Sequence, residues 1–279
     1  AWCQRMLREH AFDSGNLFNE ELVADEAELL AQAVHDVWRR EVYPLGTAPL
    51  EALLGVWPSV AVMQLQVQPL LHQTELLGPD PQPRATLQDW LPAWVGERRA
   101  TLATLKTGWA DKARRIAGWI NAQQQGGANP FNGNLLRASS LDAWIEQIVA
   151  WAEDPEADAL VLLPDTGRTR LTPDGIVKAC KKGCRLPPLP PEFAEFEALQ
   201  QTLDTLEPLA PRLLQHATHR VAYRLDQLKR RGARFGFADL QARLDQALSP
   251  DAGEAGERLR QRILAQYPVA LIDEFQDTS

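Results

Sequence analysis

The chain has 279 residues, of which 45% are hydrophobic and 24% are charged, a balance that excludes intrinsic disorder as its general state. Its 37 acidic and 29 basic side chains give a formal charge of −8, so no global positive field attracts it to nucleic acid or anionic lipid. Any contact with DNA must therefore be local.

Cysteine content and hydropathy predict a cytoplasmic protein. Only Cys3, Cys180 and Cys184 are present, an odd and sparse set that fits a reducing compartment. No uninterrupted apolar run approaches the roughly 20 residues that a membrane-spanning helix needs, so we expect no membrane contact. The first residues have the pattern of a helix interior and the last follow directly on a motif, so both ends are expected to be cut.

Helical periodicity dominates the first half of the chain. Apolar spacing predicts a helix from Leu17 to Val42, with acidic residues early and arginines late, as the helix dipole favours. A less regular helical stretch is expected from Pro49 to about Leu77, with interruptions at Gly55 and Pro58.

The clearest pattern lies between Thr86 and Gln125, where apolar residues recur at intervals of three and four. This spacing predicts one long helix with a coiled-coil-like seam, although Arg98 occupies one position of that seam. For the apolar and aromatic residues of this seam, packing against a neighbouring helix is favoured over the alternative role of a platform on which nucleic-acid bases stack. The seam contains Leu87, Trp90, Trp94, Leu102, Leu105, Trp109, Ile116 and Trp119.

Beyond the seam, periodic and irregular stretches alternate. Ser139 or Ser140 is expected to cap a helix that carries Trp144 and Trp151. Residues 154–190 lose periodicity and predict a long loop.

The last third is predicted to be helical up to a short strand. Helices are expected from about Pro191 to Arg231, with a kink near Pro208 and Pro211, and over residues 237–248 and 254–266. Residues 268–272 form a short apolar run bounded by proline and by acids, which is typical of a buried parallel strand.

Two carboxylates follow this strand and point to phosphoryl chemistry. A buried strand would place Asp273 and Glu274 at the carboxyl end of a sheet. One carboxylate can hold Mg²⁺, and the other can orient and deprotonate an attacking water. The pair alone is a weak signal, because acids often follow strands where loops are solvated.

A longer motif makes this signal specific. Asp-Glu-Phe-Gln-Asp-Thr at residues 273–278 resembles the second motif of superfamily 1 helicases related to UvrD and Rep. Residues 237–240, Phe-Ala-Asp-Leu, resemble the element that opens a helix before this strand in those helicases, and residues 3–7 resemble the helix after their Thr-x-His motif. With residues 16–43 and 229–232, these segments look like the RecB family, the beta chains of exodeoxyribonuclease V.

The resemblance implies roles for four residues. Asp273 would bind Mg²⁺ and Glu274 would be the catalytic base of ATP hydrolysis. Gln276 would sense the γ-phosphate and Asp277 would hold the conformation of the nucleotide site, although simple capping of the strand end stays open for both. No Gly-Lys-Ser/Thr sequence occurs, so the phosphate-cradling loop is missing and this chain alone is not expected to hydrolyse ATP.

The resemblance also implies a mainly α fold with a divided motor domain. Residues 16–232 would form a helical insertion of the 1B type with a long helix. Residues 1–15 and 233–279 would belong to an incomplete α/β RecA-like motor domain that includes the strand 268–272. The family implies an ATP-dependent 3'-to-5' DNA helicase and exonuclease that acts on double-strand ends in recombinational repair, in a heterotrimer with RecC-like and RecD-like subunits.

Local positive charge offers a candidate DNA contact. Lys229, Arg230, Arg231 and Arg234 lie at a predicted helix end, where they could hold DNA phosphates, although a solvated helix terminus favours cations as well. We expect the insertion to contact either duplex or forked DNA or a partner subunit. An AddA-like or UvrD-like helicase, and a non-catalytic helical interaction module, stay open as alternatives.

Overall fold

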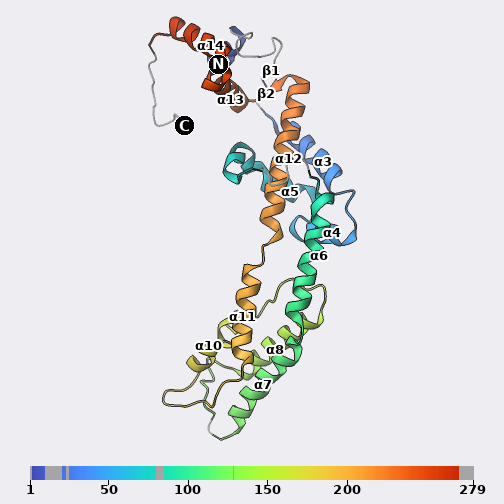
Figure 1. Ribbon diagram of the computed structural model, residues 1–279, viewed down its shortest axis with the longest axis vertical. Coiled ribbons are helices and arrows are strands. Elements are labelled where there is room, and N and C mark those ends of the chain that lie inside the picture. The colour runs from blue at the N-terminus through green and yellow to red at the C-terminus, as the bar shows by residue number, and fades with distance from the viewer. Residues whose placement is uncertain (1, 10–20, 23–24, 80–84, 128, 270–279) are drawn as a thin grey trace. The chain divides into compact units, whose positions relative to one another are not determined.

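The computed structural model describes residues 2–9, 21–22, 25–79, 85–127 and 129–269 (Figure 1). These residues are mainly helical, as predicted, and the chain divides into two compact units. Unit 1 contains Ala1–Leu45, Leu53–Arg84 and Ala210–Ser279, and unit 2 contains Gly46–Ala52 and Ala85–Leu209.

Unit 1 is formed by both ends of the chain and the segments next to them. Its two short strands, β1 and β2, pair in parallel. Its elements are α1 (Trp2–Glu9), β1 (Glu21–Leu22), α3 (Ala27–Glu41), α5 (Val60–Val67), the 3-10 helix η1 (Gln68–Leu77), α12 (Leu209–Gly232), β2 (Arg234–Phe235), α13 (Phe237–Leu248), η2 (Pro250–Ala252) and α14 (Gly253–Gln266).

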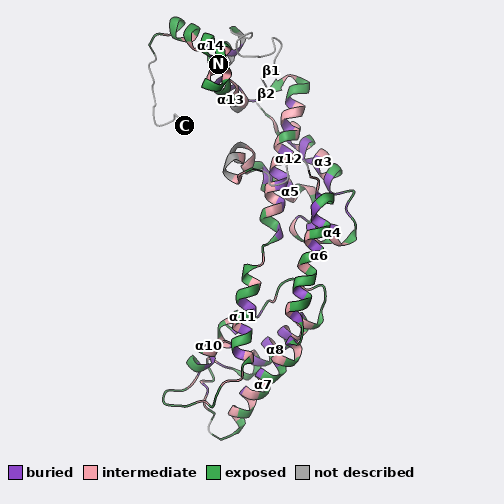
Figure 2. Ribbon diagram, viewed as in Figure 1, coloured by how far each residue is buried: buried purple, intermediate pink, exposed green. Residues whose placement is uncertain are grey.

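Unit 2 is helical throughout its regular elements. Many of its buried residues, purple in Figure 2, belong to one core that includes residues of α7, α8 and α11. Its elements are α6 (Leu87–Lys106), α7 (Trp109–Gln125), α8 (Ala138–Glu153), α9 (Gly167–Arg170), α10 (Pro173–Lys178) and α11 (Glu192–Thr205), and α4 (Thr47–Val56) is divided between the two units.

The single long helix predicted over residues 86–125 is wrong, because the structure has two helices there. α6 ends at Lys106 and α7 begins at Trp109, after Gly108 with a φ of +76°. A positive φ cannot continue a right-handed helix, and glycine adopts it without the steric cost of a Cβ. The apolar seam still predicts burial correctly on both sides of the break, at Leu87, Trp90, Leu102, Trp109 and Ile116.

Two basic residues of α6 bind the segment that follows α8. The Lys106 ammonium is buried and donates hydrogen bonds to the carbonyl oxygens of Asp154 and Ala157, both at 2.6 Å. Arg98, which interrupts the seam, contacts both carboxylate oxygens of Asp158 at 2.8 and 3.0 Å. Both side chains therefore satisfy polar groups next to the core.

The prediction of a long loop over residues 154–190 is only partly right, because most of these residues lack regular structure but two short helices lie among them. The segment contains α9 and α10, and it buries Leu162, Leu171 and Ile176 in the core of unit 2. Trp144 of α8 donates a hydrogen bond from Nε1 to the Pro164 carbonyl oxygen at 2.8 Å. The apolar residues lack a regular spacing because short helices and extended chain alternate, so periodicity does not reveal their burial.

Ion pairs also connect α7 with α11. The Arg115 guanidinium donates a hydrogen bond to Glu192 at 2.6 Å, and Lys112 lies 2.7 Å from Glu195. The hydrogen bond from Arg115 holds the pKa of the Glu192 carboxyl below its usual value. This contact stabilises unit 2 at neutral pH and is lost as acid protonates the carboxylate.

The first predicted helix begins later than its apolar pattern indicates. α3 starts at Ala27, whereas Glu21 and Leu22 form β1. Leu22 pairs with Phe235 of β2, so a tertiary contact holds this part of the chain in an extended conformation. Residues 10–20 lie outside the described part of the chain.

The remaining helices agree with the sequence apart from one cap and one break. α8 begins at Ala138 with Arg137 as its N-cap, so the cap predicted at Ser139 or Ser140 is wrong. The helix predicted from Pro191 to Arg231 is interrupted between Thr205 and Leu209, close to the expected kink. The two helices expected after it correspond to α13 and α14.

Within the described residues, no single helix has both the length and the apolar character needed to cross a bilayer. α4 and the stretch Val60–Leu71 meet these criteria only as a pair, which is bent by 53°.

We predict opposite effects of alanine at two glycines of unit 2. A Cβ on Gly175 would lie 1.7 Å from the Thr169 carbonyl oxygen, so Gly175→Ala should lower the free energy of unfolding by about 1–3 kcal/mol. Gly118 lies inside α7 with open space around it, so Gly118→Ala should raise that free energy by up to about 1 kcal/mol. Urea unfolding of the chain measures both, and equal effects of the two substitutions would contradict the packing at Gly175.

Candidate functional site

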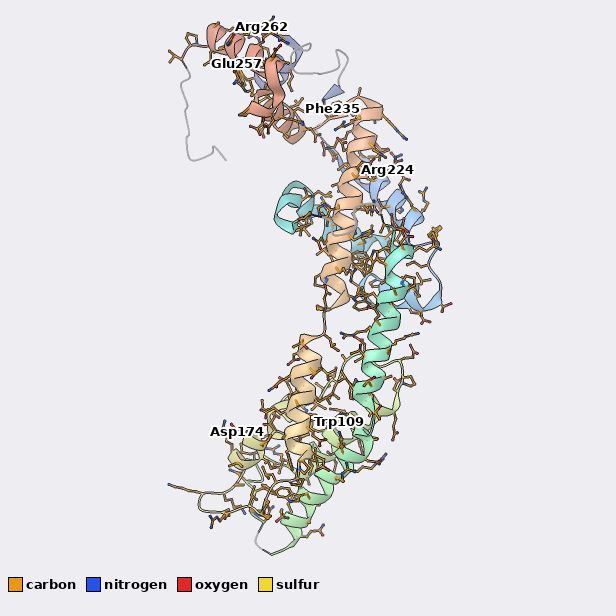
Figure 3. The ribbon with its side chains drawn as sticks, viewed as in Figure 1. Trp109, Asp174, Arg224, Phe235, Glu257 and Arg262 are labelled. Carbon is orange, nitrogen blue, oxygen red and sulfur yellow. The ribbon has the colours of Figure 1, made fainter. Side chains whose placement is uncertain are left out.

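The two motif-bearing segments at opposite ends of the sequence lie against each other in unit 1. α1 contains residues 3–7, and α13 begins with residues 237–240. Met6 and Leu7 of α1 are buried against Leu240 and Leu244 of α13. α14 completes this cluster, and its residue Glu257 is labelled in Figure 3.

Asp239, the acidic residue of the Phe-Ala-Asp-Leu element, fixes the start of α13. Its Oδ2 accepts a hydrogen bond from the backbone N–H of Gly236 at 2.8 Å. A carboxylate in the first turn also interacts favourably with the positive end of the helix dipole. Asp239 and Leu240 therefore have separate structural roles, one at the helix start and the other in the core.

A buried lysine links this helix start to α3. The Lys229 ammonium, at the end of α12, lies 2.7 Å from Asp239 Oδ2 and 2.9 Å from Glu26 Oε2. The Lys229 side chain is only 7% exposed, whereas the side chains of Glu26 and Asp239 are 24% and 28% exposed. We call Glu26, Lys229 and Asp239 the basal cluster.

Backbone pairing reinforces the basal cluster. β1 and β2 lie side by side just before α3 and α13, and Glu21 pairs with Arg234. A Cβ on Gly236 would lie 1.9 Å from Glu26 Oε1, so the glycine leaves room for that carboxylate. Phe235 of β2, labelled in Figure 3, is buried, and the Arg243 guanidinium lies 3.4 Å from the centre of its ring.

The structure separates Lys229 from the three arginines predicted to contact DNA with it. Its ammonium is directed into the basal cluster and is shielded from solvent. Arg230, Arg231 and Arg234 are exposed, and Arg230 pairs with Asp226 at 2.9 Å. A buried, doubly paired ammonium cannot reach a phosphate at the surface, whereas the three arginines are exposed to solvent.

The predicted nucleotide-site residues Asp273, Glu274, Gln276 and Asp277 lie outside the described part of the chain, as does most of the strand predicted over residues 268–272. Among the residues that the structure does describe, no three or more His, Cys, Asp or Glu side chains gather as metal ligands would.

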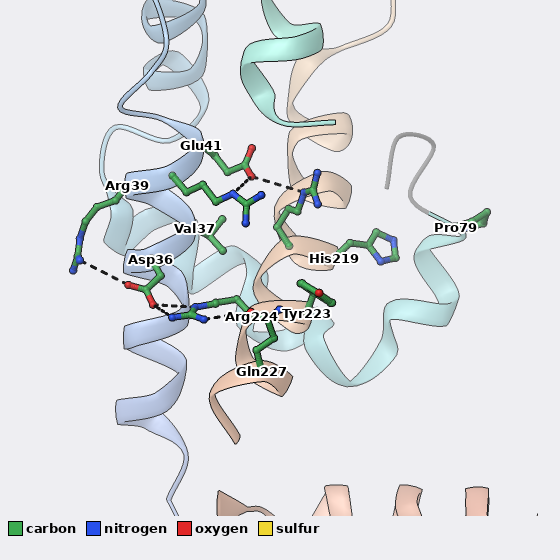
Figure 4. A pocket seen from close by; sticks show the side chains of 11 residues that line it. Asp36, Val37, Arg39, Glu41, Pro79, His219, Tyr223, Arg224 and Gln227 are labelled. Atoms are coloured by element: carbon green, nitrogen blue, oxygen red, sulfur yellow. Dashed lines mark hydrogen bonds and ion pairs between the residues drawn. The ribbon is translucent and has the colours of Figure 1, made fainter. Parts of the chain in front are cut away.

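Unit 1 also contains an open cavity of about 1200 Å³ between α3 and α12 (Figure 4). Asp36 of α3 accepts hydrogen bonds from Nε and Nη2 of Arg224 at 3.0 and 2.6 Å. Glu41 is buried, with the Arg220 guanidinium at 3.9 Å and the His216 ring at 3.5 Å. The cavity is lined by Asp36, Val37, Arg39, Arg40, Glu41, Pro79, His219, Arg220, Tyr223, Arg224 and Gln227.

Charge in the cavity is unbalanced. Four arginines face two carboxylates, Asp36 and Glu41, so the lining carries a net positive charge with its histidine neutral. Arg39 and Arg40 are the most exposed of the four, at 62% and 71%. Such a lining suits an anionic group. The sequence did not reveal this cavity, because α3 and α12 lie far apart along the chain.

Comparison with known proteins finds a helicase family over the part of the chain that contains the motifs at residues 237–240 and 273–278. Residues 188–279 match the UvrD/REP helicase N-terminal domain. Over 279 residues, which are 99% of this chain and 22% of the relative, the sequence is 31% identical to RecBCD enzyme subunit RecB of Escherichia coli. It is 28% identical to the RecB subunit of Haemophilus influenzae, with 99% of this chain and 24% of the relative covered. The chain thus spans about a fifth of the length of these relatives.

The motifs and these matches together make the chain a UvrD-like superfamily 1 helicase sequence. Within that class it is RecB-like, as its motifs predicted, since RecB subunits match along almost its whole length.

We predict that the basal cluster contributes strongly to the stability of unit 1. Lys229→Met would leave Glu26 and Asp239 without their shared cation, so the free energy of unfolding should fall by roughly 2–4 kcal/mol. Urea denaturation followed by circular dichroism measures this change.

The neighbouring residue provides a matched control. Arg230 and Asp226 form an exposed pair, so Arg230→Met should change the free energy of unfolding by no more than about 0.5 kcal/mol. Equal stability of the Lys229→Met variant and the unmodified chain would contradict the importance of the basal cluster.

Proposed function

We propose that this chain supplies a helical insertion, and the motor segments at its base, of an ATP-dependent 3'-to-5' DNA helicase and exonuclease. The complete protein would act on double-strand DNA ends in recombinational repair, in a heterotrimer with RecC-like and RecD-like subunits. The names of its relatives, RecBCD enzyme subunits, support this assignment.

The basal cluster is the observation that carries the proposal. An inserted domain must leave its host and return to it at neighbouring points. Glu26 lies just before α3, where the helical region begins, and Lys229 lies near the end of α12, where that region ends. Lys229 contacts Glu26, and it also contacts Asp239 of the Phe-Ala-Asp-Leu element. These two contacts support a helical region that both starts and ends beside the motor segments.

The nucleotide chemistry is assigned to the acidic motif. In the complete protein, bound Mg²⁺-ATP would supply the phosphoryl group whose transfer to water drives movement. We assign Asp273 to holding the metal and Glu274 to orienting and deprotonating the water. Gln276 would sense the γ-phosphate and Asp277 would hold the site's conformation.

Within unit 1, two groups of arginines suit DNA phosphates. Arg230, Arg231 and Arg234 are exposed near the basal cluster, and the cavity between α3 and α12 has an excess of positive charge. The chain as a whole is acidic, with a formal charge of −8, so its positive charge is confined to particular faces such as these.

The first functional prediction concerns the catalytic base. In the complete protein, Glu274→Gln should reduce ATP hydrolysis by at least about a thousandfold, because the amide cannot deprotonate water. A coupled ATPase assay in the presence of DNA measures this, and Asp251→Asn, in η2, is a matched acidic control that should keep the rate. Unwinding of duplex DNA by the Glu274→Gln variant would contradict the assignment of the base.

The second functional prediction concerns DNA phosphates. Replacing Arg230, Arg231 and Arg234 with glutamine in the complete protein should weaken binding to duplex and forked DNA equally for all sequences. The slope of log affinity against log salt should fall by about 0.9 for each lost phosphate contact. Fluorescence anisotropy titrations over a range of salt concentrations measure both effects.

Arg258→Gln is the matched control for this titration. Arg258 is an exposed arginine of α14 that pairs with Glu254 at 3.7 Å, so its loss should leave the slope unchanged. An unchanged slope in the triple variant would mean that the three arginines do not contact phosphate, and would favour a partner subunit as their target.

A further inference from the structure

A proline-rich segment joins α10 to α11 at the surface of unit 2. Residues 185–191 read Arg-Leu-Pro-Pro-Leu-Pro-Pro, and they follow a turn in which Gly183 has a φ of +85°. The segment has no helical or strand assignment up to Pro190, and Pro191 is the N-cap of α11.

Covalent geometry determines the conformation of this segment. Each proline ring fixes φ near about −65°, and the residue before each proline is driven out of the helical region. Leu186, Pro187, Leu189 and Pro190 all precede a proline. The stretch from Leu186 to Pro190 therefore favours extended conformations such as the polyproline II helix, which has about three residues per turn.

Solvent exposure varies along the segment, in which Pro187 is exposed and Pro190 is half-buried. Leu186 and Leu189, three positions apart, are half-buried and pack against the core of unit 2. Arg185, Pro188 and Pro191, also three positions apart, are all exposed. One edge of the segment is thus anchored to the core, and another presents an arginine and two prolines. We call Arg185, Pro188 and Pro191 the proline ridge.

The surroundings of the proline ridge are positively charged and hollowed. An open hollow of about 650 Å³ lies beside it, lined in part by Val177, Lys181 and Arg185. Lys178, Lys181 and Lys182 are exposed, and the sequence contains no acidic residue between Asp174 and Glu192. Val177 is apolar and 56% exposed.

The turn before the ridge is fixed to the rest of unit 2. The Lys181 backbone N–H donates a hydrogen bond to the Pro130 carbonyl oxygen at 2.8 Å, and the Lys181 ammonium donates to that of Asn129 at 2.6 Å. Anchoring at both the turn and the leucines means that a partner would find the segment already in its extended form. Binding would then cost little conformational entropy.

We propose that Arg185–Pro191 is a docking segment for a partner protein that carries an aromatic-lined groove with an acidic rim. Proline rings at threefold spacing insert between aromatic side chains in such grooves, and Arg185 with the neighbouring lysines would meet the acidic rim. Proline lacks an N–H donor, and the exposed ridge is apolar apart from Arg185, so this edge suits a protein groove better than a DNA backbone. The proposal goes beyond the helicase function and does not require catalytic activity.

Photo-cross-linking in cells that contain the complete protein and its natural partners tests this proposal. A benzoylphenylalanine replaces Val177, beside the ridge, and the control position is Ala103, an exposed residue of α6. We expect irradiation at position 177 to yield one protein adduct, cross-linked at a peptide with aromatic and acidic residues. The control position should not yield that adduct.

Two further variants of the position-177 protein distinguish a protein groove from DNA. Pro187→Ala with Pro188→Ala should lower the adduct yield by about tenfold, because both the rigid backbone and the ridge are lost. Lys178→Gln with Lys182→Gln should lower it by about two- to threefold, and only at low salt, because those exposed charges act at the rim.

Several outcomes would overturn the proposal: no adduct, an adduct with DNA, or a protein adduct whose yield is unchanged by the proline substitutions. Each readout is a cross-link rather than ATP hydrolysis or unwinding. A failure of the helicase assignment is therefore distinguishable from a failure of the docking segment.

Discussion

A lysine ammonium that is shielded from water requires oxygen atoms to pair with, and in unit 1 the carboxylates that meet this requirement come from distant parts of the sequence. Lys229 comes from the end of α12, Glu26 from the residue before α3, and Asp239 from the first turn of α13. Desolvation makes an unpaired charge costly, so the three side chains favour a single arrangement of their segments. The pairing of β1 with β2, the start of α13 and the position of Leu240 in the core all lie within a few residues of this contact.

Much of the helical architecture could be predicted from the sequence, because burial on one face of a helix leaves a periodic record. The apolar seam of residues 86–125, the tryptophans of α8 and the helices α13 and α14 were all recognised in this way. Residue identity also revealed the class of protein, since the acidic motif at residues 273–278 is more specific than any single carboxylate pair. Both signals are local, and each is contained in a short stretch of sequence.

Features that depend on contacts between distant segments could not be predicted in the same way. In the sequence, Lys229 looked like one member of a basic surface run. Its contacts with Glu26, about 200 residues earlier in the chain, and with Asp239 show that its ammonium is directed inward. Arg39 and Arg40 looked like ordinary cations at a helix end, yet they line a cavity with residues of α12. Residues 154–190 looked like a loop because their buried side chains follow no repeat. Gly108 was a local signal of a helix break that was overlooked. Its positive φ separates α6 from α7 within an apolar pattern that is otherwise continuous.

The basal cluster also bears on how the proposed insertion could move with the proposed motor segments. β1 and β2 pair over only two residues each, and so short a ladder resists bending poorly by itself. Ion pairs at 2.7 and 2.9 Å, shared by one nearly buried ammonium, add restraints in two directions, towards α3 and towards α13. A displacement of α13 would therefore pull on Lys229 and, through it, on the end of α12. Because a buried ion pair cannot be exchanged for water without a large cost, this connection transmits small displacements better than an exposed pair such as Arg230 with Asp226. Asp239 belongs to the Phe-Ala-Asp-Leu element, so in the function proposed above this restraint would connect the insertion with its motor segments.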